Sequence, residues 1–254
     1  MRIAVNTRVL LPNKLEGIGI YTHHVLQHMV RDHPNDEFVF LFDRPFSNEF
    51  IYGPNVRAVQ AGPPARHPFL YVAWFEYTIP RLLKKIKPDV FLSPDGYLSL
   101  RSSVPQVPVI HDINFEHFPQ YFSPISRWHY RSYFPRYAEK ATRIATISEF
   151  SREDIVDTYG VPREKIDVAY NGVDAIYAPA LPEDVEEVKR TITSGEEYFV
   201  FVGALYRRKN LATALRAFDL FKQKTGSAMK FVVAGQAYAE TAELVAEVNT
   251  LSAA

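Results

Sequence analysis

Three consecutive cations follow a glycine in the segment best suited to bind a ligand. Gly203 comes directly after an apolar run, and Arg207, Arg208 and Lys209 stand just before Asn210 and a stretch with helical periodicity. A glycine lets the backbone approach an anion, a helix N-terminus offers free N–H groups, and the cations neutralise its charge. The segment therefore predicts a diphosphate site, whose members are Gly203, Arg208, Lys209 and Asn210. The alternative is a run of solvated surface cations.

Two glycines, Gly17 and Gly19, lie at the start of the first predicted helix, after a long loop. Close backbone approach and the helix N-terminus would suit a phosphate group. A dinucleotide-binding fingerprint would need a third glycine at Thr22 and would place its glycines directly after the strand. A dehydrogenase is therefore disfavoured, and an ordinary loop-to-helix turn is the alternative to a phosphate site.

His111 and Asp112 directly follow the apolar run Pro108–Ile110. In open parallel sheets ligands bind at the carboxyl ends of the strands. A histidine beside a carboxylate at that edge can orient a substrate hydroxyl or stabilise positive charge, so we predict catalytic roles for both residues. The alternative is a structural histidine at a strand end. No metal is expected, because His117 and His129 lack acidic companions at helical spacing.

Two further segments combine a structural signal with a possible role in binding. In the run Ser148-Glu149-Phe150-Ser151, a serine can cap the helix that follows, with acidic residues in its first turn. Asn171-Gly172 follows a strand, and this dipeptide favours a turn. If that turn lies at a hinge between domains, Asn171 would line a substrate pocket.

The composition narrows the classes of protein. Hydrophobic residues make up 47% of the 254 residues and charged residues 23%, a balance typical of a globular chain with a core. Lys plus Arg and Asp plus Glu both number 29, so nucleic acid is not an expected partner. The absence of cysteine fits a reducing compartment, and we expect a cytoplasmic protein. Neither a signal peptide nor a membrane-spanning run is evident, so membrane contact would be peripheral.

Short β-rich runs alternate with helical stretches, which predicts an α/β fold with a parallel sheet covered on both faces. The expected strands of the first part are Arg2–Asn6, Glu37–Phe42, Val56–Gln60, Val90–Leu92, Val107–Ile110, Arg143–Ile147 and Ile166–Ala169. The expected helices are Ile18–Arg31, Leu70–Lys85, Ile125–Lys140 and Ser151–Tyr159.

A break rich in proline around Val173–Pro182 indicates a domain boundary. We predict one domain over residues 1–174 and a second unit over residues 175–254. The second unit reads as the opening part of a doubly wound domain. Its expected elements are the helix Glu183–Thr193, the strand Tyr198–Val202, the helix Asn210–Lys222, the strand Lys230–Ala234 and the helix Ala239–Leu251.

In this order and spacing, the segments resemble the retaining GT-B glycosyltransferases of family four, the group 1 type. That family includes mannosyl- and glucosyltransferases of cell-surface polysaccharide synthesis. Gly17–Tyr21 is similar to its glycine loop, His111-Asp112 to its central histidine motif, and Ser148–Ser151 to its Ser-Glu segment. Asn171–Asp174 is similar to its interdomain turn, and Gly203–Asn210 to its donor loop.

The resemblance implies a GT-B fold, with an acceptor-side Rossmann-like domain followed by part of a donor-binding one. It implies transfer of a hexose to a saccharide or lipid-linked acceptor, with retention, and mannose from GDP-mannose is the first candidate. The nucleotide sugar would be a co-substrate, and no cofactor or metal would be required. His111 would contact the sugar or the acceptor, and Gly17 and Gly19 would approach the phosphate. Arg208 and Lys209 would hold the leaving diphosphate.

The sequence also departs from the family pattern. Ala204 stands where many relatives place an arginine, and Arg208 would have to serve instead. The family's two glutamates separated by seven residues are expected beyond the end of the chain, and Glu240 and Glu247 do not reproduce that arrangement. The alternative function is therefore a non-catalytic fragment, or one subunit of a split glycosyltransferase with a C-terminal complementing chain.

Two clusters of aromatic and basic residues raise the question of a membrane or acceptor surface. Such helices can lie on anionic membranes, here the inner face, whereas packing in the core is the more ordinary explanation. The first cluster comprises Phe69, Tyr71, Trp74, Phe75, Arg81, Lys84, Lys85 and Lys87. The second comprises Arg127, Trp128, Tyr130, Arg131, Tyr133, Phe134, Arg136 and Tyr137.

Overall fold

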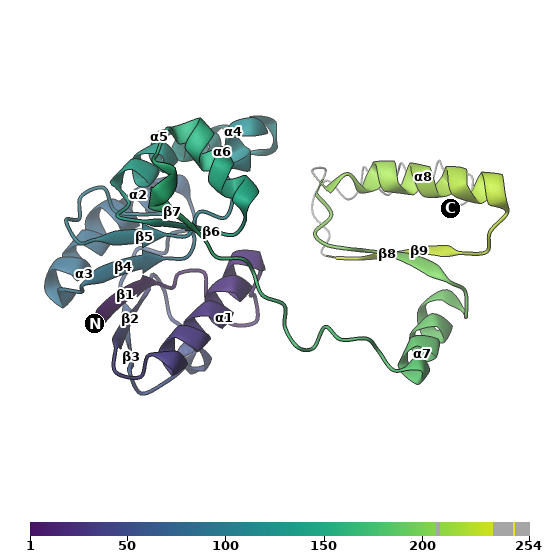
Figure 1. Ribbon diagram of the computed structural model, residues 1–254, viewed down its shortest axis with the longest axis horizontal. Coiled ribbons are helices and arrows are strands. Elements are labelled where there is room, and N and C mark those ends of the chain that lie inside the picture. The colour runs from purple at the N-terminus through teal and green to yellow at the C-terminus, as the bar shows by residue number, and fades with distance from the viewer. Residues whose placement is uncertain (207–208, 236–245, 247–254) are drawn as a thin grey trace. The chain divides into compact units, whose positions relative to one another are not determined.

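The computed structural model describes residues 1–206, 209–235 and 246 (Figure 1). The chain divides into two compact units, Met1–Gly172 and Val173–Ala254. Arg208 lies outside the described residues, as does the expected helix Ala239–Leu251 apart from Ala246.

The first unit is built on a parallel five-stranded sheet in the order β3-β2-β1-β4-β5 (Figure 1). A second parallel pair, β6 and β7, continues from β5 through a bridge between Val109 and Ala145. Because all these strands are parallel, their carboxyl ends meet at one edge. The strands are β1 (Arg2–Asn6), β2 (Glu37–Phe42), β3 (Val56–Gln60), β4 (Val90–Ser93), β5 (Gln106–Pro108), β6 (Ile144–Thr146) and β7 (Ile166–Val168).

The apolar run of β2 shows why this sheet is covered on both faces. All its residues from Phe38 onward are buried, as is typical of a strand with helices on each side. Phe38 and Phe40 pack in one cluster with Leu26 of the first helix. Val39 and Leu41 point to the opposite face and pack in a larger cluster with the other helices.

The helices of the first unit lie near their predicted positions, with one short helix, α4, that the periodicity did not predict. Among the described residues, no helix has both the length and the apolar character needed to cross a bilayer. The α-helices, apart from the segment described next, are α1 (Gly17–Asp32), α4 (Asn114–His117), α5 (Pro124–Lys140) and α6 (Glu149–Tyr159). Single 3-10 turns are η1 (Asn48–Phe50), η3 (Pro119–Tyr121) and η4 (Arg163–Lys165).

The helix predicted over Leu70–Lys85 is interrupted by a π-helical turn. Pro80 has no N–H to donate to the preceding turn, and a wider turn before it accommodates the missing bond. Trp74, Phe75 and Glu76 lie in this turn and are all buried. The three parts are α2 (Pro68–Ala73), η2 (Trp74–Thr78) and α3 (Ile79–Ile86).

The second unit contains a parallel two-stranded sheet. Its strands occupy the predicted residues, and aromatic rings of the helix between them pack on the sheet. Phe218 lies 6.1 Å from Phe199 and 5.3 Å from Phe231, measured between ring centroids. The elements are α7 (Pro182–Thr193), β8 (Tyr198–Val202), α8 (Leu211–Thr225) and β9 (Lys230–Ala234).

Candidate functional site

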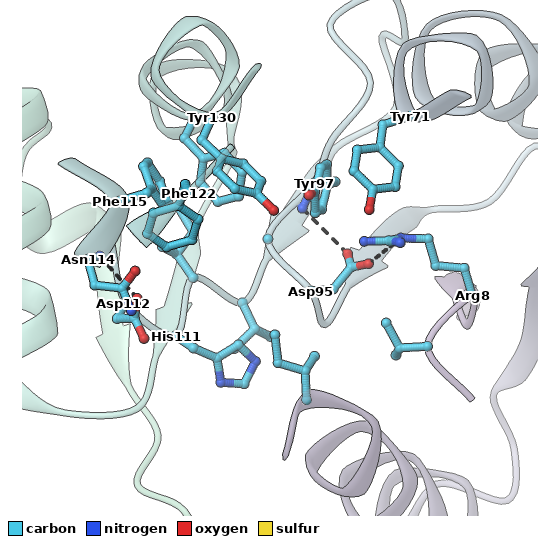
Figure 2. A pocket seen from close by; sticks show the side chains of 16 residues that line it. Arg8, Tyr71, Asp95, Tyr97, His111, Asp112, Asn114, Phe115, Phe122 and Tyr130 are labelled. Carbon is cyan, nitrogen blue, oxygen red and sulfur yellow. Dashed lines mark hydrogen bonds and ion pairs between the residues drawn. The ribbon is translucent and has the colours of Figure 1, made fainter. Parts of the chain in front are cut away.

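A pocket of about 290 Å³ lies at the carboxyl edge of the sheet in the first unit (Figure 2). The segments that follow β1, β4 and β5 supply much of its lining, which is where ligands bind in open α/β sheets. The volume is near the lower end of the range for small-molecule sites, roughly 300–1,000 Å³. The lining residues are Arg8, Val9, Ile18, Tyr71, Asp95, Gly96, Tyr97, Val109, Ile110, His111, Asp112, Asn114, Phe115, Phe122, Tyr130 and Phe134.

A buried ion pair forms the polar side of the pocket. Arg8 Nε lies 2.6 Å from Asp95 Oδ2, and the two side chains are only 11% and 2% exposed. The other carboxylate oxygen of Asp95 accepts hydrogen bonds from Asn6 Nδ2 at 2.8 Å and Ser93 Oγ at 3.1 Å. The ends of β1 and β4 therefore hold this carboxylate in one position.

Two tyrosine rings hold the Arg8 guanidinium. Its Cζ lies 4.8 Å from the Tyr71 centroid and 4.7 Å from the Tyr97 centroid, both within the range of cation–π attraction. Burial acts to lower the pKa of Arg8, but the negative charge of Asp95, together with smaller contributions from Tyr97, Tyr71 and Asp43, outweighs it and the pKa is raised. The pocket therefore contains a permanent cation whose charge a neighbouring carboxylate compensates.

His111 lies in the pocket, and its ring is held from two sides. Nε2 is 2.9 Å from the carbonyl oxygen of Pro94. Because a carbonyl can only accept, Nε2 carries the proton, and Nδ1 is the acceptor of the neutral ring. The Tyr21 ring on α1 packs against the imidazole in a T-shaped arrangement, at 4.7 Å between centroids. The structure thus fixes both the tautomer and the orientation of His111.

Asp112 lines the same pocket from an exposed position. One of its carboxylate oxygens accepts the backbone N–H of Asn114 at 3.1 Å, at the start of α4. This contact gives Asp112 a local structural role, which does not require a catalytic one. The catalytic assignment made from the sequence stays a prediction.

The glycine segment reaches the pocket through Ile18. Gly19 is buried, and a Cβ there would lie 3.0 Å from the carbonyl oxygen of Val9, so the close contact between helix and loop favours glycine. Gly17 is exposed, with no atom near its missing Cβ. Both lie in the first turn of α1, where N–H groups lack intrahelical acceptors. A phosphate contact by Gly17 and Gly19 stays a prediction.

Aromatic side chains from α4, the segment after it and α5 form the wall opposite the ion pair (Figure 2). Phe115 contacts Tyr130 at 5.0 Å and Phe134 at 4.9 Å between ring centroids. Sequence reasoning missed the Arg8–Asp95 pair altogether. Arg8 and Asp95 both closely follow predicted strands, so the strand-end rule applied to His111 would also have placed them at the ligand-binding edge of the sheet.

The two aromatic and basic clusters divide between core, pocket and surface. Trp74 and Phe75 are fully buried, and Tyr71 lines the pocket. On α5, Tyr137 is buried in the core, whereas Trp128 is 52% exposed. Core packing therefore explains most of these rings, and a few remain on the surface.

The other predicted segments of the first unit lie outside the pocket lining. Ser148 caps α6, because its Oγ accepts the N–H of Ser151 at 3.1 Å, which confirms the predicted structural role. Asn171 is exposed next to the boundary between the two units. The turn expected at Asn171-Gly172 lies slightly later, where the Tyr177 N–H donates to the Asp174 carbonyl at 3.0 Å. The side chain of Asp174 can stabilise this later turn, as it accepts the N–H of Ile176.

In the second unit, Gly203 and Asn210 flank the predicted diphosphate segment. Gly203 has φ of 151°, a conformation that favours glycine, and its N–H donates to the Ala234 carbonyl at 2.9 Å. Asn210 adopts a left-handed conformation before α8, and its Oδ1 accepts the Thr213 hydroxyl at 2.7 Å. Lys209 is exposed beside the helix start. The predicted contacts to a diphosphate stay predictions.

A metal site is not evident in the described part of the chain. No group of three or more His, Cys, Asp or Glu side chains among residues 1–206, 209–235 and 246 could hold an ion.

Comparison with known families matches both units. The model of Glycosyltransferase Family 4 matches residues 15–177, which contain the pocket segments from Ile18 to Phe134. The model of glycosyl transferases group 1 matches residues 183–253. These matches confirm the resemblance found in the sequence motifs.

Individual relatives are distant and longer than this chain. O-antigen chain mannosyltransferase B of Escherichia coli is 25% identical over 155 residues, which cover 60% of this chain and 40% of that protein. An uncharacterized glycosyltransferase of Methanocaldococcus jannaschii is 25% identical over 254 residues, covering 92% of this chain and 63% of the relative. The chain thus spans less than two thirds of either protein.

A solved structure confirms the fold class. Anabaena HepE, crystallised in complex with UDP and glucose, superposes with a TM-score of 0.65 at 17% identity. The match covers 99% of this chain and 66% of HepE. The α/β fold of GT-B type predicted from the sequence is therefore correct.

Proposed function

The chain belongs to Glycosyltransferase Family 4, and on that premise we propose that the protein transfers a hexose from a nucleoside diphosphate sugar to a saccharide or lipid-linked acceptor. The observation that carries this proposal is the pocket at the carboxyl edge of the first sheet. It holds His111 in a fixed orientation beside the N-terminal turn of α1, inside the span that the family model matches.

In this proposal His111 recognises a hydroxyl of the reacting sugars. Its Nε2 proton is engaged by the Pro94 carbonyl, so Nδ1 is left to accept a hydrogen bond. Asp112 supplies negative charge at the rim, where positive charge develops on a sugar ring during transfer. Free N–H groups at Gly17 and Gly19 are suited to a phosphate oxygen.

The second unit would bind the leaving nucleoside diphosphate. Lys209 provides an ammonium group and the start of α8 provides free N–H groups, a combination that stabilises negative charge as it develops. Arg208 is assigned to the same task from its sequence position alone. Asn171 is assigned to the donor because of its place beside the boundary between the units.

Mannose is our first candidate for the transferred sugar, and GDP-mannose for the donor. The Escherichia coli relative is named a mannosyltransferase, which supports mannose, whereas HepE was solved with UDP and glucose. Mannose and glucose are both hexoses, so both relatives are consistent with a nucleoside diphosphate hexose as the donor. Retention of anomeric configuration and independence from metals or other cofactors are part of the proposal and rest on the family resemblance.

A transfer assay tests the proposal directly. The protein would be incubated with GDP-mannose or UDP-glucose and with methyl glycosides as acceptors, and proton NMR would follow the anomeric signals. We expect a product with the anomeric configuration of the donor. His111→Ala should lower the rate by about a hundredfold, the scale of losing one stabilising contact in the transition state.

The matched control is His67→Ala, an exposed position outside the pocket, which should transfer at the original rate. Equal loss in both variants would contradict the role of His111. Absence of transfer from every donor and to every acceptor would contradict the proposed activity.

We also propose peripheral contact with an anionic membrane. Phe69 on α2 and Trp128 on α5 are 62% and 52% exposed, the two helices are in contact, and Arg66 and Arg127 flank these rings. Co-sedimentation with phosphatidylglycerol vesicles should exceed that with phosphatidylcholine, and the double substitution Phe69→Ser, Trp128→Ser should abolish the excess. Equal binding to both vesicles would refute this contact.

A further inference from the structure

The arginine and carboxylate side chains that line the pocket sum to one negative charge. Arg8 is the one arginine or lysine in the lining, and two carboxylates, Asp95 and Asp112, lie there with it. The Arg8 charge is already engaged by Asp95 at 2.6 Å, deep on the polar side. Asp112 adds a negative charge at the exposed rim. An incoming phosphate or carboxylate would find no uncompensated cation and would pass a like charge on entry.

Hydrogen-bonding groups are nevertheless available inside the pocket. Arg8 Nη1 donates to the Ala65 carbonyl at 3.2 Å, and the guanidinium, which lines the pocket, carries further N–H groups suited to a ligand oxygen. The hydroxyl of Tyr130 is directed from the aromatic wall toward Tyr97 (Figure 2). Burial raises the pKa of Tyr130, so this hydroxyl stays protonated and can both donate and accept.

The wall opposite the ion pair is suited to an apolar ring face. Phe115, Phe122 and Tyr130 lie together there, across from Arg8 and Asp95 (Figure 2). The electron-rich face of an aromatic ring attracts the weakly positive C–H groups that a pyranose presents on one side. The hydroxyl groups on the rim of the same pyranose would reach the polar side of the pocket.

We propose that this pocket selects the terminal sugar of the acceptor as a neutral, hydroxylated ring, and that the Arg8–Asp95 pair discriminates against acceptors phosphorylated or carboxylated on that ring. This inference rests on the proposed glycosyltransferase function and narrows its acceptor class. The volume of about 290 Å³ is consistent with one ring in the pocket, the remainder of a longer acceptor lying outside.

Ligand-observed NMR on the full chain provides the test. Saturation-transfer difference titrations would compare methyl α-mannopyranoside and methyl β-glucopyranoside with mannose 6-phosphate. We expect binding of at least one methyl glycoside, with the strongest saturation on protons of one ring face. The phosphorylated sugar should bind at least about tenfold more weakly than that glycoside, because its charge must be desolvated without a free partner.

Two variants on one helix separate pocket binding from general effects. Tyr130→Phe keeps the ring and removes the hydroxyl, and should weaken binding of the methyl glycoside about threefold to tenfold, the range for one neutral hydrogen bond. Tyr133→Phe removes a hydroxyl three residues further along α5, outside the pocket lining, and should leave binding unchanged. Equal effects of the two variants would overturn the assignment of the pocket.

A third variant, Asp95→Asn, tests the charge argument. It leaves Arg8 without its counter-charge, so binding of mannose 6-phosphate should rise at least about tenfold relative to the methyl glycoside. An unchanged ratio in a folded variant would overturn the proposed discrimination. If this variant does not fold, the comparison of the three ligands on the original chain decides the same point.

The outcome is distinguishable from failure of the proposed function. Nucleotide binding by the same sample is measured separately, because the diphosphate segment belongs to the second unit. A chain that binds a nucleotide but prefers the phosphorylated sugar, or binds no sugar in this pocket, would overturn the acceptor inference alone.

Discussion

His129 provides a quantitative test of how the first unit is packed. Its side chain is fully buried on α5, and its ring stacks on Tyr133 at 4.6 Å with an interplanar angle of 19°. Neither ring nitrogen has a hydrogen-bond partner among the described residues. Burial, with a smaller contribution from the positive charge of Arg8, lowers the pKa of His129 to about 4. The folded protein therefore holds this histidine neutral.

The sign of the pH effect follows from the two states. The unfolded chain has an ordinary histidine pKa of about 6.5, so it binds more protons than the folded chain between about pH 6.5 and pH 4. The contribution of neutral His129 to the free energy of unfolding is therefore complete above pH 6.5, and it is lost as the pH falls from about 6.5 to about 4. Between about pH 7.5 and pH 5, His129 should lower the free energy of unfolding by about 2 kcal/mol.

The substitution His129→Phe isolates this contribution. Phenylalanine keeps an aromatic ring for the stack on Tyr133 and removes both unpaired nitrogens. When the pH is lowered from about 7.5 to about 5, the free energy of unfolding of the variant should fall by about 2 kcal/mol less than that of the original chain. At the higher pH it should be as stable or more stable, because an unsatisfied buried polar group is removed.

Tryptophan fluorescence during urea unfolding is the suitable assay, since both tryptophans, Trp74 and Trp128, belong to the first unit. The control is His67→Gln at an exposed position, which should retain the pH dependence of the original chain. An identical pH dependence in the His129→Phe variant would refute the reasoning, because the buried histidine would then contribute no linkage.

Three other substitutions, one of them with a matched control, have defined expectations. Ser148→Ala removes the cap of α6 and should lower the free energy of unfolding of the first unit by about 1 kcal/mol in the same urea assay. Gly235→Ala would place a Cβ 1.8 Å from the Gly203 carbonyl oxygen. Circular dichroism melting should therefore show that the second unit is destabilised by about 1–3 kcal/mol. The control Gly172→Ala, where no atom lies near the added Cβ, should leave the stability unchanged. Arg8→Met leaves the buried carboxylate of Asp95 unpaired and should cost about 3–5 kcal/mol by tryptophan-monitored urea unfolding.

Local patterns predicted the elements well where burial is periodic or continuous. The apolar run of β2 and the strands β8 and β9 lie at the predicted residues, because each is a short β-rich segment between polar turns. The segment Leu70–Lys85 was predicted as one helix, whereas the structure has three helical pieces that span Pro68–Ile86. Its apolar periodicity continues through the π-helical turn, so only the missing N–H of Pro80 marks the interruption.

The site was predictable where one segment carries the signal. His111 follows a strand directly, and the strand-end rule placed it in the pocket. The strand-end rule could place Arg8 and Asp95 at the same edge of the sheet, but they are far apart in the sequence, so it could not predict that they form an ion pair. The same holds for Gly203 and Gly235, whose close approach depends on the pairing of β8 with β9. Contacts of this kind require the fold itself.

Calorimetric titration of the chain with GDP, UDP and ADP tests the central claim most directly, because donor recognition is common to every form of the proposed transfer. The account predicts selective binding of one of these nucleotides. Lys209→Ala should weaken that binding at least about tenfold, as expected for loss of a charged contact. Lys224→Ala, near the other end of α8, should leave it unchanged. The account would be contradicted if the chain bound none of the three nucleotides, or if the Lys209→Ala and Lys224→Ala variants bound the nucleotide equally well.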